Sequence, residues 1–287
     1  MTKMIDIHSH WGTKRGYTLR SAEELAQQKK TWNSEPKYAT EDEMAEYFRR
    51  SGVRAILDFG YTKFIPLAEA RPVHDYGFAT ERAHPDVILG HWIHIDPHAG
   101  TEGVRELSRC IDQAPGFIGF AVSGSGSGPA SDPAWRPFYA LCIEARIPAL
   151  VFVGTTGLGA GLPGGGGVVL DDCHPRHLDQ VAVRFPQLQI VAARPGWPWQ
   201  TETIAVLMHK RNIWYELHGW SPKYFAPDLK HEISRRLRER VMFGADYPLF
   251  TYERLERDWR GEGYADDVLD DVFRNNAERF LEQVKRA

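Results

Sequence analysis

The amino-acid sequence predicts an α/β fold of the (β/α)8 TIM-barrel type, and two patterns lead to that prediction. Eight short runs rich in Val, Ile and Phe recur along the chain, at residues 4–8, 53–60, 87–95, 117–124, 148–154, 188–194, 213–219 and 241–248. Amphipathic stretches lie between these runs. Strands that are apolar on both faces and alternate with helices are typical of a parallel sheet covered by helices. Eight such repeats favour a closed barrel over an open sheet.

The clearest helix signal lies between the first and second runs. In the stretch TEDEMAEYFRRSG, we expect Thr40 to be the N-cap, Glu43 to complete a capping box and Gly52 to end the helix. Similar amphipathic stretches follow later runs: TEGVRELSRCIDQAP, DPAWRPFYALCIEAR and APDLKHEISRRLRER. The sequence therefore predicts one barrel domain over residues 1–287.

Two long loops are expected at the carboxyl ends of the strands, where barrel enzymes carry their active sites. Residues 11–40 form a polar excursion after the first strand, and we interpret them as a lid-like insertion. Residues 154–167, GTTGLGAGLPGGGG, are dense in glycine but lack the spacing and the Lys-Ser/Thr ending of nucleotide-binding loops. We expect their backbone to lie close over a ligand.

Composition excludes several classes of partner. The formal net charge of −3 does not suggest nucleic-acid binding, and no apolar run approaches the roughly 18 residues needed to span a membrane. The three cysteines, Cys110, Cys142 and Cys173, show no CxxC spacing, which favours a reducing cytoplasm. A small-molecule substrate is the expected partner, and a homodimer is left open.

Three residues are expected to meet in the mouth of the barrel. His8 and His10 are two positions apart on the first strand, so their side chains point to the same side. Asp246 ends the last run, and the first and last strands of a closed barrel are neighbours. Two imidazoles and a carboxylate are a common start of a metal site, so His8, His10 and Asp246 are candidate ligands as well as candidate catalytic groups.

Several motifs together resemble the amidohydrolase-2 family of the metal-dependent amidohydrolases. They are the His-x-His of the first strand and the segments HPRHLDQVAVRFPQLQIVAARPGWPW, ELHGWSPKYF and RVMFGADYP. Within that family, the chain is most similar to aromatic-acid decarboxylases and to hydrolases of 4-hydroxyphenyl-β-ketoacyl thioesters. The resemblance implies a TIM barrel with one divalent metal, usually zinc. It also implies ligands or catalytic groups from His-x-His, from a His on each of strands five and six, and from an Asp on strand eight.

The chain departs from the family pattern at two of these positions. Phe152 stands where the resemblance implies the strand-five ligand, and Arg194 stands where it implies the strand-six ligand. His218 replaces a Ser that is usual in the family's SGWSPKYF motif. A guanidinium about 4 Å from a divalent ion would repel it by roughly 8 kcal/mol at an effective dielectric constant of about 20. His218 offers a replacement ligand from strand seven.

Three functional hypotheses follow. The first is an enzyme without a tightly bound catalytic metal, in which Arg194 binds a carboxylate or a developing oxyanion while Asp246, His8, His10 and His218 serve proton transfer. It would act on a small aromatic or β-keto carboxylic, polyketide-like substrate by hydrolysis, decarboxylation or a related C–C or ring-forming step. The second is an ordinary zinc-dependent hydrolase or decarboxylase. The third is an inactive barrel used as a binding subunit.

Aromatic residues are expected to line the same pocket. Trp11 follows the His-x-His strand, Phe152 replaces a polar ligand, and Trp197 and Tyr247 flank Arg194 and Asp246 in sequence. Together with Arg194 they are the predicted substrate-binding residues. A pocket lined by rings favours an aromatic substrate over a sugar or a small amide. His94, in WIHIDPHAG, is a further candidate for the mouth, although the resemblance implies no role for it.

Overall fold

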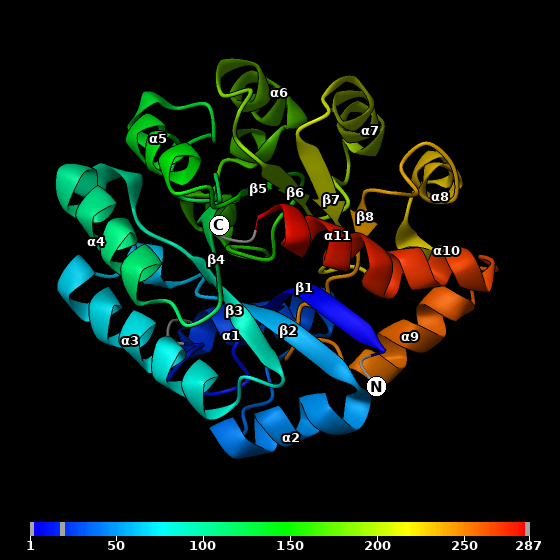
Figure 1. Ribbon diagram of the computed structural model, residues 1–287, viewed down its shortest axis with the longest axis horizontal. Helices are drawn as coiled ribbons and strands as arrows, with labels where there is room; N and C mark the ends of the chain where they lie inside the picture. The colour runs from blue at the N-terminus through cyan, green and yellow to red at the C-terminus, as the bar shows by residue number, and fades with distance from the viewer. Residues whose placement is uncertain (1–2, 18–20, 285–287) are drawn as a thin grey trace.

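The structure is a computed structural model that describes residues 3–17 and 21–284. Its eight strands form one parallel sheet in sequential order, which confirms the predicted TIM barrel (Figure 1). The strands are β1 Met4–His10, β2 Val53–Asp58, β3 Ile88–Ile93, β4 Phe117–Val122, β5 Ala149–Phe152, β6 Ile190–Ala193, β7 Ile213–Glu216 and β8 Val241–Met242.

Backbone hydrogen bonds between β1 and the segment after β8 bring the two ends of the sheet together. The amide of Ile7 donates to the carbonyl of Phe243 over 3.0 Å, and the amide of Asp246 donates to the carbonyl of His8 over 3.1 Å. The buried carboxylate of Asp6 adds a link, because it accepts from the amide of Ala245 at 3.1 Å and from the hydroxyl of Tyr252 at 2.8 Å. His8 and Asp246 are therefore neighbours, as the sequence predicts.

Most of the helices bury the outer face of the sheet, and the first and the last lie at the two ends of the barrel. The helices are α1 Ala22–Trp32, α2 Glu41–Ser51, α3 Leu67–Ala83, α4 Gly100–Gln113, α5 Arg136–Glu144, α6 Pro175–Arg184, α7 Gln200–His209, α8 Pro227–Ile233, α9 Tyr252–Arg260, α10 Asp266–Asp270 and α11 Asn276–Gln283. The start of α2 has the expected capping box between Thr40 and Glu43, and Gly52 follows it with φ 67°. None of the described helices is both long and apolar enough to span a membrane.

All of the predicted strands except the first end earlier than their apolar runs. The run 188–194 ends as β6 at Ala193, and the run 241–248 is a strand only at Val241–Met242. At β6 the physical reason lies in the backbone, because Arg194, the residue after the strand, has φ 76°. An extended strand cannot continue through the left-handed region.

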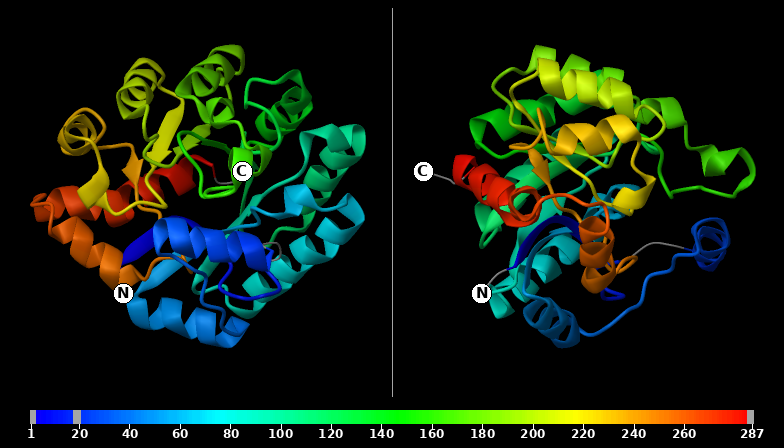
Figure 2. Two further views of the ribbon diagram at one scale, coloured as in Figure 1. Left: turned by 180° about the vertical axis from the view of Figure 1, so that it is seen from behind. Right: turned by 90° about the vertical axis from the view of Figure 1, so that its right-hand side faces the viewer.

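The two ends of the barrel differ in what covers them. At one end, Phe280 of α11 packs with the inward-facing core, including Ile7 and Trp214. At the other end lie α1 and the loop 154–167, which project together away from α11 (Figure 2, right). The loop approaches α1 closely, since a Cβ atom built on Gly161 would lie 2.6 Å from Oγ1 of Thr31. The second end is the one toward which the strands' carboxyl ends point.

Candidate active site

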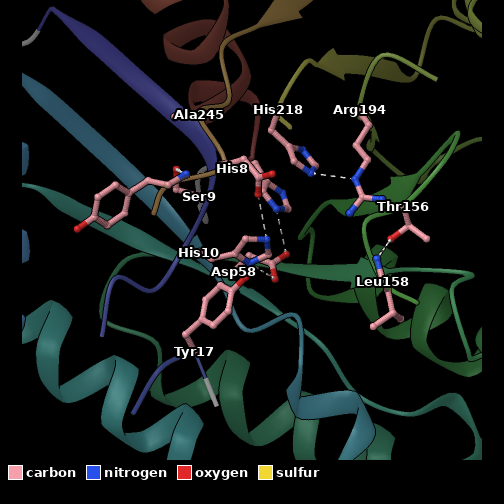
Figure 3. Close-up of polar contacts among 12 residues, drawn as sticks. His8, Ser9, His10, Tyr17, Asp58, Thr156, Leu158, Arg194, His218 and Ala245 are labelled. Atoms are coloured by element: carbon pink, nitrogen blue, oxygen red, sulfur yellow. Dashed lines mark hydrogen bonds and ion pairs between the residues drawn. The ribbon is translucent and has the colours of Figure 1, made fainter. Parts of the chain in front are cut away.

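A cavity of about 570 Å³ opens at the carboxyl ends of the strands. Its polar lining gathers side chains from segments far apart in the sequence: His10, Asp58, Lys63, His94, Arg194 and Asp246. Figure 3 shows several of these groups converging on one centre. A concave site with a few convergent charged groups is the usual form of a small-molecule binding site.

His10 lies between two carboxylates. Its Nε2 atom is 3.1 Å from Oδ1 of Asp246, and its Nδ1 atom is 3.5 Å from Oδ1 of Asp58. Burial alone would lower the pKa of His10, but its contacts with Asp246 and Asp58 outweigh burial and raise the pKa well above the ordinary value. The two carboxylates therefore favour the protonated form of His10.

The pKa values of the two carboxylates are shifted in the opposite direction. Burial favours the protonated acids, but the neighbouring histidines outweigh it and hold the pKa of Asp58 and of Asp246 well below the ordinary value. His8 differs from His10, because burial lowers the pKa of His8 well below the ordinary value. The surroundings thus favour the charged form of His10, the neutral form of His8 and the ionised forms of Asp58 and Asp246.

Arg194 and His218 form the second part of the site. The Nε atom of Arg194 donates to Nε2 of His218 over 3.2 Å, and its Nη1 donates to the carbonyl of Thr155 over 3.2 Å. Nδ1 of His218 lies 2.5 Å from Oε1 of the buried Glu216. An imidazole that accepts at Nε2 must carry its proton on Nδ1, so His218 is a neutral bridge between Arg194 and Glu216.

The guanidinium of Arg194 also stacks on an aromatic ring. Its Cζ atom lies 4.8 Å from the ring centroid of Phe152, within the range of a cation–π contact. Phe152, the residue in the expected place of a ligand, thus supports the cation instead. The ring of His8 stacks on that of His218 at a centroid distance of 3.7 Å, so the two parts of the site are in direct contact.

Both Arg194 and Asp246 have left-handed backbone conformations. Their φ values are 76° and 60°, and non-glycine residues rarely adopt such values. A strained backbone of this kind costs about 1–3 kcal/mol and is concentrated at functional sites. Arg194 directly follows β6 and Asp246 lies beyond the end of β8, and both side chains line the cavity.

The donor atoms in the cavity fit a divalent cation in type and in proximity. One ligand atom each from His8, His218 and Asp246 lie within 4.8 Å of one another, and the same holds for His8, His10 and Asp58. Within residues 3–17 and 21–284, both ring nitrogens of His8 and the Oδ1 atoms of Asp58 and Asp246 are buried without a hydrogen bond. Imidazole nitrogen and carboxylate oxygen are ligands of zinc and manganese.

The structure separates the predicted site residues into two groups. Phe152, Arg194, His10 and Asp246 line the cavity, and His8 and His218 are buried directly beside them. The positions of these six side chains agree with the roles predicted for them, which stay predictions.

The other predicted substrate-binding residues lie away from the described cavity lining. Trp11 is fully buried and packs against Phe59, Tyr76 and His91, because side chains alternate along a strand and Trp11 follows the inward-facing His10. Tyr247, which lies beyond the end of β8, lines a separate hollow beside α2. Trp197 is 47% exposed and contacts Trp220 at the rim.

Sequence reasoning missed Asp58, Glu216 and Lys63. Asp58 and Glu216 are the last residues of β2 and β7, so an acid at the end of an apolar run was the signal that could have found them. Lys63 gives no such signal, because it reaches the cavity from a short helix, Thr62–Phe64, and donates to the carbonyls of Ser123 and Ser125. Burial lowers the pKa of Lys63 to about 8.

His94, named as a further candidate, does reach the site. Its Nε2 atom lies 2.7 Å from Oδ2 of Asp58, and its ring lies 5.9 Å from that of Phe152. Asp58 therefore contacts His94, His10 and, at 3.6 Å, His8. One carboxylate holds three imidazoles in place.

Comparisons with known proteins agree with this architecture. The family model described as "Amidohydrolase" matches residues 5–283, and a search of curated protein sequences finds no match. An uncharacterised TIM-barrel protein from Bordetella bronchiseptica has a TM-score of 0.74 and 18% identity, with 99% of each chain covered.

Two further solved structures carry functional descriptions. One is a 5-carboxyvanillate decarboxylase from Novosphingobium aromaticivorans in complex with manganese and a nitrobenzoic acid, at 16% identity and TM-score 0.69, covering 97% of this chain and 96% of the other. The other is a probable 2-pyrone-4,6-dicarboxylic acid hydrolase from Acinetobacter baumannii with bound citric acid, at 14% identity and TM-score 0.64, covering 98% and 99%. At these identities the likeness shows the fold that the chains share.

Proposed function

The chain belongs to the amidohydrolase family of enzymes, and we propose that it acts on a small aromatic or β-keto carboxylic substrate without a tightly bound catalytic metal. The reaction would be hydrolysis, decarboxylation or a related C–C or ring-forming step. The decarboxylase and pyrone hydrolase of the same fold act on carboxylated rings, which supports this substrate class.

The observation that carries the proposal is the position of Arg194. Its guanidinium lines the cavity, held by His218 and Thr155 and stacked on Phe152. A fixed guanidinium binds a carboxylate by two parallel hydrogen bonds or stabilises an oxyanion that develops during the reaction. In this proposal Arg194 supplies the positive charge that orients the substrate in the cavity.

Proton transfer is assigned to Asp246 and His10. The two groups are 3.1 Å apart and both line the cavity, so a proton can pass between them and a substrate atom placed beside them. Asp58 stabilises the charged form of His10 from the other side. Asp246 acts as the general acid or base, and His10 is its proton-transfer partner.

The second candidate is a metal-dependent form of the same chemistry, favoured by the buried donor atoms without hydrogen bonds. His8, His10 and Asp246 would hold the ion, and His218 would join them if Arg194 turned away. A bound divalent ion would polarise a substrate oxygen or activate water. The leading proposal rests on the charge of Arg194, which weakens cation binding in the same cavity.

Metal analysis combined with a substrate screen distinguishes the two candidates. Purified enzyme, before and after dialysis against a chelator, would be analysed for metal content and assayed on hydroxybenzoates, β-keto acids and pyrone carboxylates. We expect less than stoichiometric metal and activity that survives the chelator. Stoichiometric zinc or manganese that is lost together with activity would support the metal-dependent form, and inactivity on every compound would contradict the proposed substrate class.

A further inference from the structure

We propose that the natural substrate is larger than one ring: its acidic head lies beside Arg194, and a polycyclic or arylalkyl tail lies among aromatic side chains at the cavity mouth. These side chains, the aromatic collar, are Trp32, Phe64, Trp220, Tyr224 and Phe250. The orientation of the head rests on the proposed function, whereas recognition of the tail depends only on the collar.

The size of the cavity is the first support. Its volume is about 570 Å³, whereas a cavity of about 150 Å³ is enough to hold one benzene ring. A benzoate at Arg194 would therefore leave most of the space filled with water. Ligands usually fill most of the pocket that they occupy, so a substrate of two or more rings matches this volume better than a single ring.

The second support is the exposure of the collar. Seven large hydrophobic side chains are exposed in the described parts of the chain, and three of them line this one cavity: Trp32, Phe64 and Tyr224. Exposed apolar side chains that gather at one concave site mark a binding surface. Their apolar faces become buried when a flat apolar group enters between them.

The third support is the way α1 completes the collar. Trp32 is the last residue of α1, and its ring lies 6.2 Å from that of Trp220, which follows β7, at an interplanar angle of 67°. Trp197 contacts Trp220 from the outer side at 5.9 Å. α1 lies in front of the barrel in the left panel of Figure 2. The collar thus has one wall from the insertion and one from the barrel, which is suited to holding a flat tail between rings.

The collar and the charged centre lie in one continuous cavity. Arg194, His10 and Asp246 line its inner part at the strand ends, and the collar residues come from α1 and from loops beyond those ends. A substrate that spans both parts places its acidic group at Arg194 and its apolar rings toward α1. The inferred class is a carboxylic acid attached to a fused-ring or extended aryl group.

Calorimetric titration of the full chain with two ligand series tests this inference. One series is benzoate, 2-naphthoate and anthracene-2-carboxylate, and the other is the three corresponding neutral amides. We expect the Kd to fall by at least about tenfold from one ring to three in both series. Equal Kd values across either series would overturn the inference, and so would a failure of both series to bind.

Matched variants test whether the additional rings bind at the aromatic collar. Trp32→Ala and Trp220→Ala should raise the Kd of the three-ring ligands by about fivefold or more and change that of benzoate less than about twofold. Trp199→Ala is the control, because Trp199 packs on His174 and is absent from the described cavity lining. Equal weakening of benzoate and anthracene-2-carboxylate by the collar variants would contradict a tail site.

The titrations also distinguish an error in the proposed function from an error in this inference. If Arg194→Gln left the affinity of all carboxylates unchanged, the carboxylate would not bind at Arg194, but the amide series would still decide whether the collar binds a tail.

Discussion

The Nε atom of Arg194 lies 3.2 Å from Nε2 of His218, on the far side of an imidazole whose Nδ1 faces the buried Glu216. This arrangement holds a guanidinium in the place where the family resemblance implies a metal ligand. It also engages the Nε2 lone pair of His218, a donor that could have replaced the missing ligand. In the proposed function, these three residues orient a cation toward the substrate and weaken the binding of a metal ion.

Replacing Arg194 by histidine should strengthen metal binding. Arg194→His removes a positive charge and adds a ligand, and histidine tolerates the left-handed backbone at this position better than most residues. We expect at least about tenfold tighter zinc binding, and more when Phe152→His is added. Competition with a chromophoric chelator measures this affinity. Arg194→Gln, which removes the charge without adding a ligand, is the control, and wild-type binding as tight as that of Arg194→His would refute the idea.

Asp246→Asn should abolish proton transfer while keeping the fold. Asparagine is isosteric and accepts a φ of 60°, so the turn after β8 should form as before. We expect kcat/KM to fall by about 10²–10⁴-fold, with circular dichroism unchanged. Asp228→Asn, on the exposed side of α8, should have no effect on activity. Full activity in Asp246→Asn would remove Asp246 from the chemistry.

Carboxylate binding should weaken as the pH rises through about 8. Burial lowers the pKa of Lys63 to about 8, so the ammonium is charged below that pH and neutral above it. Loss of a positive charge from the cavity should raise the Kd of 2-naphthoate by up to about tenfold between pH 7 and 9.5. Calorimetric titrations of 2-naphthoate across this pH range would measure the change in Kd. Neutral 2-naphthamide should show no such change, and Lys63→Arg, which stays charged, should lose the transition.

Glu106 should matter for stability against acid. This buried carboxylate binds Arg71, Arg109 and His74 between α3 and α4. Burial opposes ionisation, but hydrogen bonds from Arg109 and His74 outweigh it and hold the pKa of Glu106 well below the ordinary value of 4.5. A carboxyl group with a lowered pKa stabilises the fold above that value, and the stabilisation is lost as the pH falls.

Glu106→Gln should therefore destabilise the protein at pH 7 by about 3 kcal/mol, and the difference from wild type should shrink below pH 4.5. Urea unfolding at pH 7, 5 and 3.5 measures both effects. The matched control is Glu102→Gln, whose partner Arg105 is largely exposed, and we expect a change below about 0.5 kcal/mol. A difference that did not depend on pH would contradict the assigned role.

Much of the site follows from strand alternation in the sequence. Parallel strands in a barrel all deliver their carboxyl ends to one face, so His8, His10 and Asp246 had to meet there once the barrel was predicted. Alternation also places Trp11, the residue after His10, on the side away from the cavity, whereas the position of Tyr247, beyond the end of β8, does not follow from alternation. Asp58 and Glu216 could also have been predicted from the sequence, because each is an acid at the end of its strand.

The sequence by itself determined the barrel, the end of it that carries the site, and the exchange of a ligand for Arg194. Only the tertiary structure decided that Arg194 pairs with His218, that Lys63 enters the cavity, and that Trp32 of α1 faces Trp220 across its mouth. The physical reason is that alternation and strand order are local properties of the chain. Contacts between loops depend instead on strand tilt, on two left-handed backbone turns and on side-chain rotamers, which no local pattern encodes.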